Sequence, residues 1–112
     1  VRNYAWKENP LVRFAGQFSG VEGYVESAAS GMVAAIGLAQ ALSGREETDF
    51  TGQTLLGALA RHVSTPTPNF QPMNANFGIL DPMEKRIKGK KERYEAMSAR
   101  SLAVMDKLIQ GM

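Results

Sequence analysis

The residues best suited to bind a ligand form a glycine-rich turn that contains Gly16, Gly20 and Gly23. The apolar run before the turn, which we expect to form a strand, consists of Leu11, Val12, Phe14 and Ala15. Glycine lets the backbone approach a ligand closely, and the helix expected after the turn offers unpaired N–H groups. The spacing differs from G-x-G-x-x-G, so it does not predict a pyrophosphate site. From spacing alone, a cofactor contact and a purely structural turn remain equally open.

A second chemical feature is a run of basic residues in the C-terminal third. Residues 82–112 carry eight Lys or Arg and four Asp or Glu, whereas the preceding residues carry five and seven. The run consists of Lys85, Arg86, Lys88, Lys90, Lys91 and Arg93. Such a cluster suits contacts with nucleic-acid phosphates, which carry no sequence information. A solvated helix face is the alternative, and Tyr94 suits core packing better than base stacking.

The composition excludes several kinds of site. The chain has no cysteine and one histidine, His62, so disulfides, thiolate metal sites, a thiol nucleophile and a multi-histidine metal site are excluded. His62 itself is expected to be structural. The most apolar stretch, Ala28–Leu42, is short for a membrane span, and the first residues do not resemble a signal peptide. We therefore expect a cytoplasmic protein without a membrane contact, and the missing initiator Met indicates a fragment.

The residues predict a mainly α-helical chain. Helices are expected over residues 21–43, 52–63 and 82–109. Gly44 would stop the first helix, Thr51 would cap the second, and Asp81-Pro82 would begin the third, with Gly89 as a weak point. Residues 64–78 are rich in Pro and Asn and are expected to be irregular, anchored by their apolar residues Phe70, Met73 and Phe77.

The first helix carries a ridge of small residues at every fourth position: Gly23, Ser27, Gly31, Ala35 and Ala39. Residues four apart share a helix face, so this ridge would allow close packing against a sheet or another helix. A single short strand supplies no such sheet, which points to sequence upstream. An isolated piece could instead bury the ridge by self-association.

The glycine segment also carries a family resemblance. Residues 15–31 read Ala-Gly-Gln-Phe-Ser-Gly-Val-Glu-Gly-Tyr-Val-Glu-Ser-Ala-Ala-Ser-Gly, and further motifs lie at residues 54–59, 69–73, 76–80 and 90–95. Together they resemble the C-terminal portion of the folate- and FAD-dependent tRNA (uracil-5-)-methyltransferases, the TrmFO family. The related GidA (MnmG) proteins, which modify the tRNA wobble uridine, share the Gly-Gln start but are expected to have a Thr-rich version of Val21–Val25.

The resemblance implies a flavoenzyme that forms ribothymidine in the T-loop of tRNA. The carbon would come from methylenetetrahydrofolate by way of reduced FAD, with NAD(P)H as the electron source. Residues 1–46 would be the strand–glycine turn–helix end of an α/β FAD-binding domain, and residues 47–112 a helical C-terminal region. The catalytic cysteine and the dinucleotide fingerprint would lie upstream. This chain alone is therefore expected to be inactive and unable to hold FAD.

The resemblance also implies which residues contact ligands. The flavin contacts would be Gly16, Gln17, Gly20, Val21, Glu22, Gly23 and Tyr24, and the basic run would contact tRNA. Because Glu22 and Glu26 would repel a phosphate, we expect the flavin ring or ribityl chain at this helix start. The loop at residues 69–78 would either help to form a folate or flavin pocket or serve only as a pinned loop. A stand-alone helical RNA-binding module without a cofactor is the alternative function.

Overall fold

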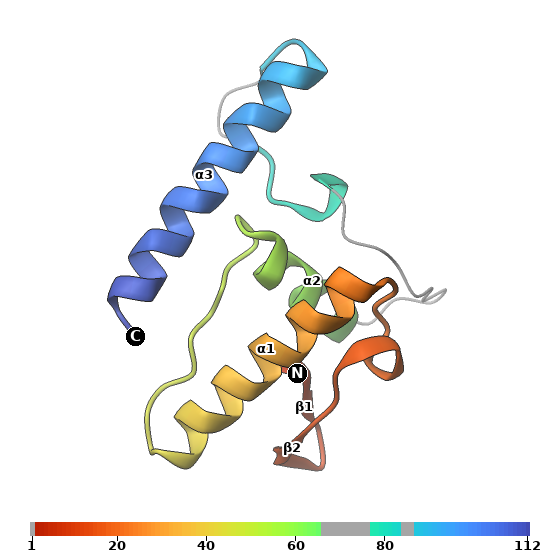
Figure 1. The fold of residues 1–112 in the computed structure, drawn as a ribbon, viewed down its shortest axis with the longest axis vertical. Helices are drawn as coiled ribbons and strands as arrows, with labels where there is room; N and C mark the ends of the chain where they lie inside the picture. The colour runs from red at the N-terminus through yellow and green to blue at the C-terminus, as the bar shows by residue number, and fades with distance from the viewer. Residues whose placement is uncertain (1, 66–76, 84–86) are drawn as a thin grey trace.

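The computed structural model describes residues 2–65, 77–83 and 87–112. Its regular elements are the hairpin strands β1 (Ala5–Trp6) and β2 (Asn9–Arg13) and the helices α1 (Tyr24–Leu42), α2 (Leu55–Ser64) and α3 (Lys90–Gln110) (Figure 1). Three short 3-10 turns, η1 (Arg2–Tyr4), η2 (Gly16–Ser19) and η3 (Phe77–Ile79), connect them. The prediction of a mainly helical chain is confirmed.

The N-terminal strands form a small antiparallel sheet, with Ala5 opposite Arg13 and Trp6 opposite Asn9. The sequence indicated one strand, and the second, β1, was missed because it is two residues long. A two-stranded ribbon is only marginally stable by itself. Here α1 packs against β2, and the ring of Phe14 contacts the rings of Trp6 and Phe18.

Helix α1 begins later than the sequence indicated. Gly20 and Gly23 have φ angles of 105° and 97°, which are incompatible with a helix, so the predicted start at Val21 is wrong. At the other end, Ser43 is the C-cap and Gly44 has φ of 71°, which confirms the glycine stop.

The core lies where α1, α2 and the N-terminal segment meet. Its main cluster consists of Tyr4, Val21, Val33, Ala34, Phe50, Leu59 and Ala60. A second cluster consists of Ala58, Leu80 and Met97, with Phe77 and Tyr94 packed against it. This core therefore includes residues from both sides of position 46, where the sequence analysis placed the boundary between two regions. Phe77 is an anchor as predicted, whereas Phe70 and Met73 lie outside the described residues.

Helix α2 is capped by Thr54 and not by Thr51. The Thr54 hydroxyl oxygen accepts a hydrogen bond from the Gly57 N–H at 3.1 Å and donates to the Phe50 carbonyl at 2.6 Å. Thr51 instead has φ of 61° and accepts from the Gln53 N–H, so it belongs to the turn before the helix. The predicted cap is therefore wrong by three residues.

Helix α3 begins at Lys90, with Gly89 as its N-cap, and the predicted start at Asp81-Pro82 is wrong. The backbone N–H of Asp81 donates to the Gly52 carbonyl at 2.8 Å, and its carboxylate pairs with Arg61 at 2.6 Å. The Arg100 guanidinium donates to the carbonyls of Asp81 and Pro82. These tertiary contacts hold Asp81 in a loop that joins α2 to α3.

Candidate functional site

Helix α1 holds the glycine turn in place through the side chain of Ser30. The Gly16 N–H donates to the Ser30 hydroxyl at 2.8 Å, and that hydroxyl donates to the Ser27 carbonyl at 2.7 Å. Within η2, the Ser19 hydroxyl donates to the Gly16 carbonyl, and the Gly20 N–H donates to the Gln17 carbonyl. Because Ser30 is fully buried, the turn is fixed relative to the helix that follows it.

The seven predicted flavin-contacting residues divide between anchors and exposed groups. Val21 is fully buried in the core and Gly20 is buried, so these two hold the turn. The exposed members are Gln17, Glu22, Gly23 and Tyr24. Gly16, with φ of 73°, is half-buried between these groups. The turn therefore presents an exposed outer edge on a buried base.

The start of α1 is open to a ligand. Its N-cap is Gly23, which has no side chain to bond the first N–H groups, and Tyr24 is 97% exposed. A helix N-terminus with free N–H groups favours an electron-rich acceptor such as a carbonyl oxygen. Glu26 in the first turn adds negative charge that disfavours a phosphate at the same place. This edge thus fits the carbonyl oxygen of a heterocycle better than a phosphate.

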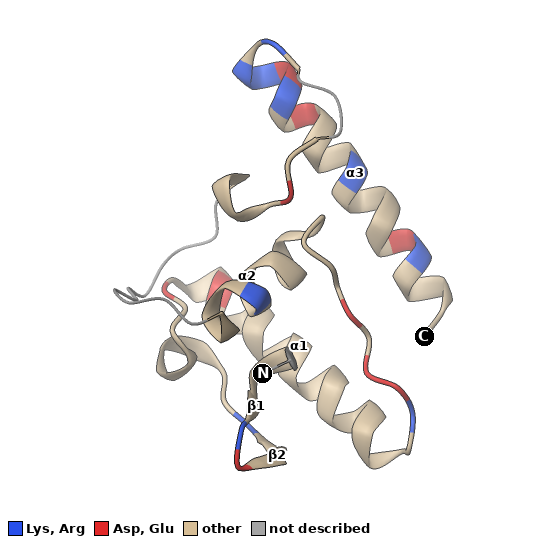
Figure 2. Cartoon of the chain, turned by 180° about the vertical axis from the view of Figure 1, so that it is seen from behind, with Lys and Arg blue, Asp and Glu red and all other residues tan. Residues whose placement is uncertain are grey.

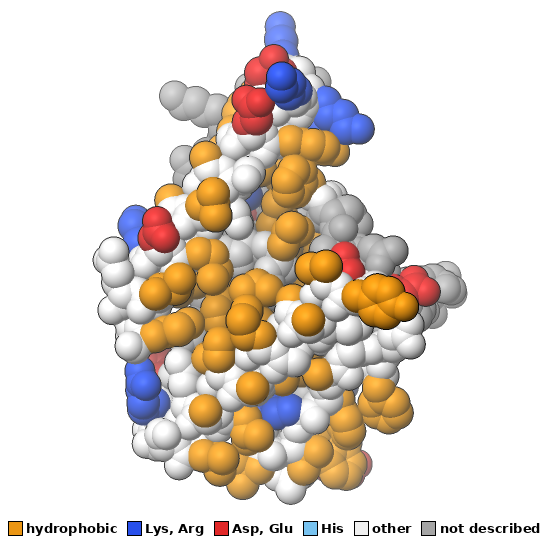
Figure 3. Space-filling view, in the orientation of Figure 1, with side chains coloured by type: hydrophobic (Ala, Val, Ile, Leu, Met, Phe, Trp, Pro, Cys, Tyr) orange, Lys and Arg blue, Asp and Glu red, His pale blue; other side chains and the backbone are white. Residues whose placement is uncertain are grey.

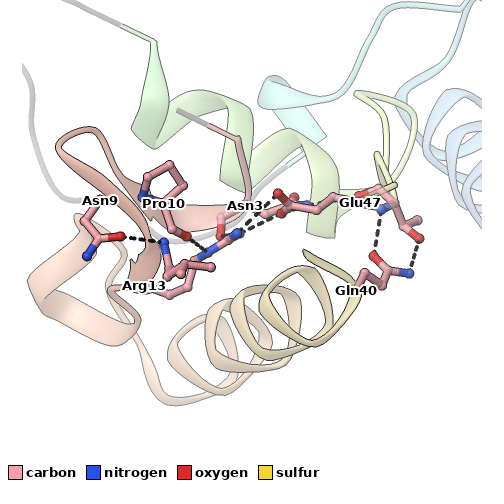
Figure 4. Close-up of polar contacts among 8 residues, drawn as sticks. Asn3, Asn9, Pro10, Arg13, Gln40 and Glu47 are labelled. Carbon is pink, nitrogen blue, oxygen red and sulfur yellow. Dashed lines mark hydrogen bonds and ion pairs between the residues drawn. The ribbon is translucent and has the colours of Figure 1, made fainter. Parts of the chain in front are cut away.

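An ion pair between Arg13 and Glu47 supports the strand that leads into the turn (Figure 4). The Arg13 guanidinium contacts the Glu47 carboxylate at 2.6 and 3.2 Å, and the Arg13 side chain is only 4% exposed. Arg13 also donates to the carbonyls of Pro10 and Asn3. Sequence reasoning missed this pair, although a charged residue within an apolar run is the signal of a buried partner. Its role is positioning, because the guanidinium is turned inward.

The side-chain amides of Gln40 and Asn3 bind Thr48, the residue next to Glu47 of the ion pair. The Gln40 side chain accepts from the Thr48 N–H at 2.8 Å and donates to the Thr48 hydroxyl at 2.8 Å. The Asn3 amide donates to the Thr48 carbonyl at 3.0 Å. The segment after α1 is thereby tied to both the helix and the N-terminus (Figure 4).

The described basic residues gather at the N-terminal end of α3 (Figure 2). Lys88, Lys90, Lys91 and Arg93 are exposed, and Lys85 and Arg86 lie outside the described residues. Lys90 Nζ and Arg93 Cζ lie 5.5 and 5.6 Å from the centre of the Tyr94 ring. Tyr94 is half-buried and packs edge-on against Phe77, which confirms its place in the core.

Two further sequence expectations concern His62 and the membrane. His62 lies half-buried on α2. Over the described ranges, no three His, Cys, Asp or Glu residues are grouped so as to hold a metal ion. Within those ranges α1 is long and apolar enough to cross a membrane, with mean hydropathy 1.3, by length and composition only. The expectation that no segment qualifies is therefore wrong on that criterion, which core helices also meet.

The sequence of this chain is similar to the sequences of known proteins. The family described as glucose inhibited division protein A (GIDA) matches residues 2–46. The methylenetetrahydrofolate–tRNA-(uracil-5-)-methyltransferases TrmFO of Staphylococcus aureus strains Newman, Mu3 and USA300 are each 51% identical over 105 residues. That stretch covers 92% of this chain and 24% of each relative, so the chain spans about a quarter of their length. These matches confirm the resemblance found in the motifs.

Proposed function

From its homology to TrmFO over 92% of its length, we propose that this chain is the C-terminal portion of a flavin-dependent tRNA methyltransferase. The complete enzyme would form ribothymidine in the T-loop of tRNA from methylenetetrahydrofolate, in the cytoplasm. Residues 1–46 would end its FAD-binding domain, and residues 47–112 would form its helical C-terminal region. The observation that carries the proposal is the anchored glycine turn that opens into the uncapped start of α1.

The residues present fit a flavin at this turn. Free N–H groups at Gly23 and Tyr24 would face a carbonyl oxygen of the flavin ring and stabilise negative charge on its reduced form. The exposed Gln17 side chain would add a hydrogen bond. The acidic Glu22 and Glu26 favour placing the diphosphate elsewhere. When bound, reduced FAD supplies one-carbon transfer from folate to uracil, with NAD(P)H as the electron source.

The exposed basic end of α3 would bind tRNA phosphates. Lys90 and Arg93 lie over the Tyr94 ring, whereas no aromatic ring in the described part of the chain is recorded against Lys88 or Lys91, so these two exposed side chains are the better placed to reach a phosphate. Phosphate contacts would orient the tRNA without reading its sequence.

A second candidate is modification of the wobble uridine by a GidA-type flavoprotein, which the GIDA match over residues 2–46 favours. The two candidates predict different products. Nucleoside mass spectrometry of tRNA after incubation with the longer protein, methylenetetrahydrofolate and NADPH would find ribothymidine in the T-loop for the first candidate. A modified wobble uridine with an unchanged T-loop would support the second.

The flavin site is tested by Gly23→Val in the longer protein. The new side chain at φ of 97° would displace the backbone at the start of α1, so we expect at least a tenfold loss of bound FAD, read from the visible flavin absorbance. Gly44→Val is the matched control, because Gly44 also has positive φ but follows the far end of α1. Equal flavin content in the two variants would contradict a flavin site at the glycine turn.

A further inference from the structure

The hydroxyl of Ser30 makes two hydrogen bonds, one of them to the glycine turn. It donates to the Ser27 carbonyl at 2.7 Å and accepts from the Gly16 N–H at 2.8 Å, and Ser30 is fully buried. A hydroxyl has a single proton, so the bond to Ser27 leaves its lone pairs for Gly16. The direction of the Gly16 N–H is therefore set by a side chain 14 residues further along the chain.

Gly16 is the residue at which the chain turns into η2. Its φ of 73° lies in the left-handed region, and an ideal Cβ on it would lie 3.9 Å from the Ser27 side chain. Glycine tolerates many backbone conformations, so the peptide before Gly16 would rotate toward water if its N–H lost its partner. Such a rotation would change the direction in which the next residue, Gln17, leaves the turn.

Gln17 combines a fixed backbone with an exposed side chain. The Gly16 carbonyl before it accepts from the Ser19 hydroxyl at 2.7 Å, and the carbonyl of Gln17 accepts from the Gly20 N–H at 3.0 Å. The exposed Gln17 amide makes no hydrogen bond to another described residue. The turn thus holds this amide in a set direction while it remains open to a ligand.

The glycine turn and the start of α1 also expose apolar side chains. Phe18, Tyr24 and Val25 are 83%, 97% and 79% exposed, and Figure 3 shows further apolar side chains gathered over α1. A few polar groups among apolar side chains are typical of sites that orient a small ligand. Because an amide both donates and accepts, it suits the edge of a planar heterocycle with carbonyl oxygens and ring nitrogens.

We propose that Ser30 is a positioning residue for the flavin: through Gly16, it holds the Gln17 amide in the direction that meets the edge of the ring. The inference rests on the proposed function, because the ring would be that of the FAD bound by the longer protein. Ser30 itself touches no ligand, since it is fully buried. Its effect on flavin binding therefore disappears once residue 17 has no amide to position.

The positioning role is tested by a double-mutant cycle in the longer protein. FAD is titrated into the apoprotein of Ser30→Ala, Gln17→Ala and the double variant, and quenching of the flavin fluorescence gives each dissociation constant. Each single variant should weaken FAD binding about two- to tenfold, the range expected for one lost hydrogen bond. The double variant should bind FAD as weakly as Gln17→Ala and no more weakly.

The matched control for Ser30→Ala is Thr54→Val. The Thr54 hydroxyl is also buried, accepts from one N–H and donates to one carbonyl, but it lies at the start of α2. Thr54→Val should lower stability as Ser30→Ala does and leave FAD binding unchanged. Ser30→Cys is the milder variant: its thiol fills the site and accepts only weakly, so it should weaken FAD binding less than Ser30→Ala.

Several results would overturn the positioning role. Unchanged FAD affinity in Ser30→Ala or in Gln17→Ala would mean that Ser30 does not hold the Gln17 amide against the ring. Equal losses in Ser30→Ala and Thr54→Val would assign the effect to stability, and multiplied losses in the double variant would show that Ser30 acts independently of Gln17. With ribothymidine still formed by the unmodified longer protein, these results keep the proposed function. A longer protein that binds no FAD would remove both.

Discussion

Gly37 lies on the buried side of α1, next to the ion pair between Arg13 and Glu47. A Cβ at this position would lie 2.7 Å from Glu47 Oε1 and 3.1 Å from Arg13 Nη1. Both atoms belong to groups held by several hydrogen bonds, so neither can move away freely. We expect Gly37→Ala to lower the free energy of unfolding by about 1–3 kcal/mol, the usual cost of overpacking. Urea denaturation followed by circular dichroism measures this change.

The matched control for Gly37→Ala is Gly31→Ala in the same helix. A Cβ at Gly31 meets only the Ala15 Cβ, at 4.0 Å, which is an ordinary contact. In the 112-residue chain this variant should gain roughly 0.5–1 kcal/mol from helix propensity. If both variants shift stability in the same direction, the close approach of α1 to the ion pair is not what constrains residue 37.

Tyr4 gives the protein an alkaline limit to its stability. Burial raises the pKa of the Tyr4 hydroxyl to about 12, and that hydroxyl has no hydrogen-bond partner among the described residues. Above pH 10 the unfolded state releases this proton first, so stability is complete below pH 10 and falls as pH rises toward 12. The loss amounts to roughly 2–3 kcal/mol over that interval.

The variant Tyr4→Phe removes this titration. It should flatten the decline in unfolding free energy between pH 10 and pH 12 and leave stability at pH 7 unchanged or slightly higher, because no hydrogen bond is lost. Thermal unfolding across the pH series measures it, with Tyr24→Phe as the control, since Tyr24 is 97% exposed. An unchanged alkaline decline in Tyr4→Phe would assign the limit to other groups.

At the scale of elements, Thr54 decides where α2 begins. Its hydroxyl both accepts from the Gly57 N–H and donates to the Phe50 carbonyl, and the residue is 1% exposed. Thr54→Val keeps the shape but leaves two buried polar groups unpaired, so we expect a loss of about 1–2 kcal/mol. Thr54→Ser keeps the hydroxyl and should lose less. Chemical denaturation that finds Ser and Val equally damaging would contradict the capping role.

The interiors of the elements could be predicted from the sequence, and their starts could not. Helical periodicity located α1 and α2 because their buried positions recur locally. Thr51 and Thr54 are both capping residue types, and only the tertiary contacts of Thr54 select between them. Asp81 likewise resembles a helix start, yet its bonds to Gly52 and Arg61 hold it in a loop. Long-range partners of this kind leave no local pattern.

At the scale of the whole molecule, the two candidate ligand sites differ in how far sequence could define them. The glycine turn is one contiguous segment, so its residues could be identified together, and the structure adds that Val21 and Ser30 anchor it. Arg13 and Glu47, the positioning pair, are 34 residues apart in the sequence, so the sequence analysis did not identify them as partners. The basic run is also contiguous, and its described members remain exposed at the start of α3 (Figure 2).

The basic end of α3 therefore yields a prediction for tRNA binding by the longer protein. The double variant Lys88→Gln, Lys91→Gln removes two positive charges from exposed side chains that lie outside the core. If both contact phosphates, the slope of log affinity against log salt should become shallower by up to about 0.9 per lost contact. Affinity for an unmodified tRNA transcript should fall equally for all tRNA sequences, because phosphate contacts read none of them.

The control for that double variant has the same change in charge at another place. Lys107→Gln with Arg45→Gln also removes two exposed cations, one near the C-terminal end of α3 and one after α1. A general effect of net charge would lower affinity and salt slope equally in both double variants. A local phosphate contact would affect only the variant at Lys88 and Lys91, since electrostatic interactions are screened beyond about 10 Å at 0.1 M salt. Filter binding across a salt series distinguishes a general charge effect from a local contact. Equal salt slopes in the two double variants would mean that the basic end of α3 is only a solvated surface and contacts no phosphate.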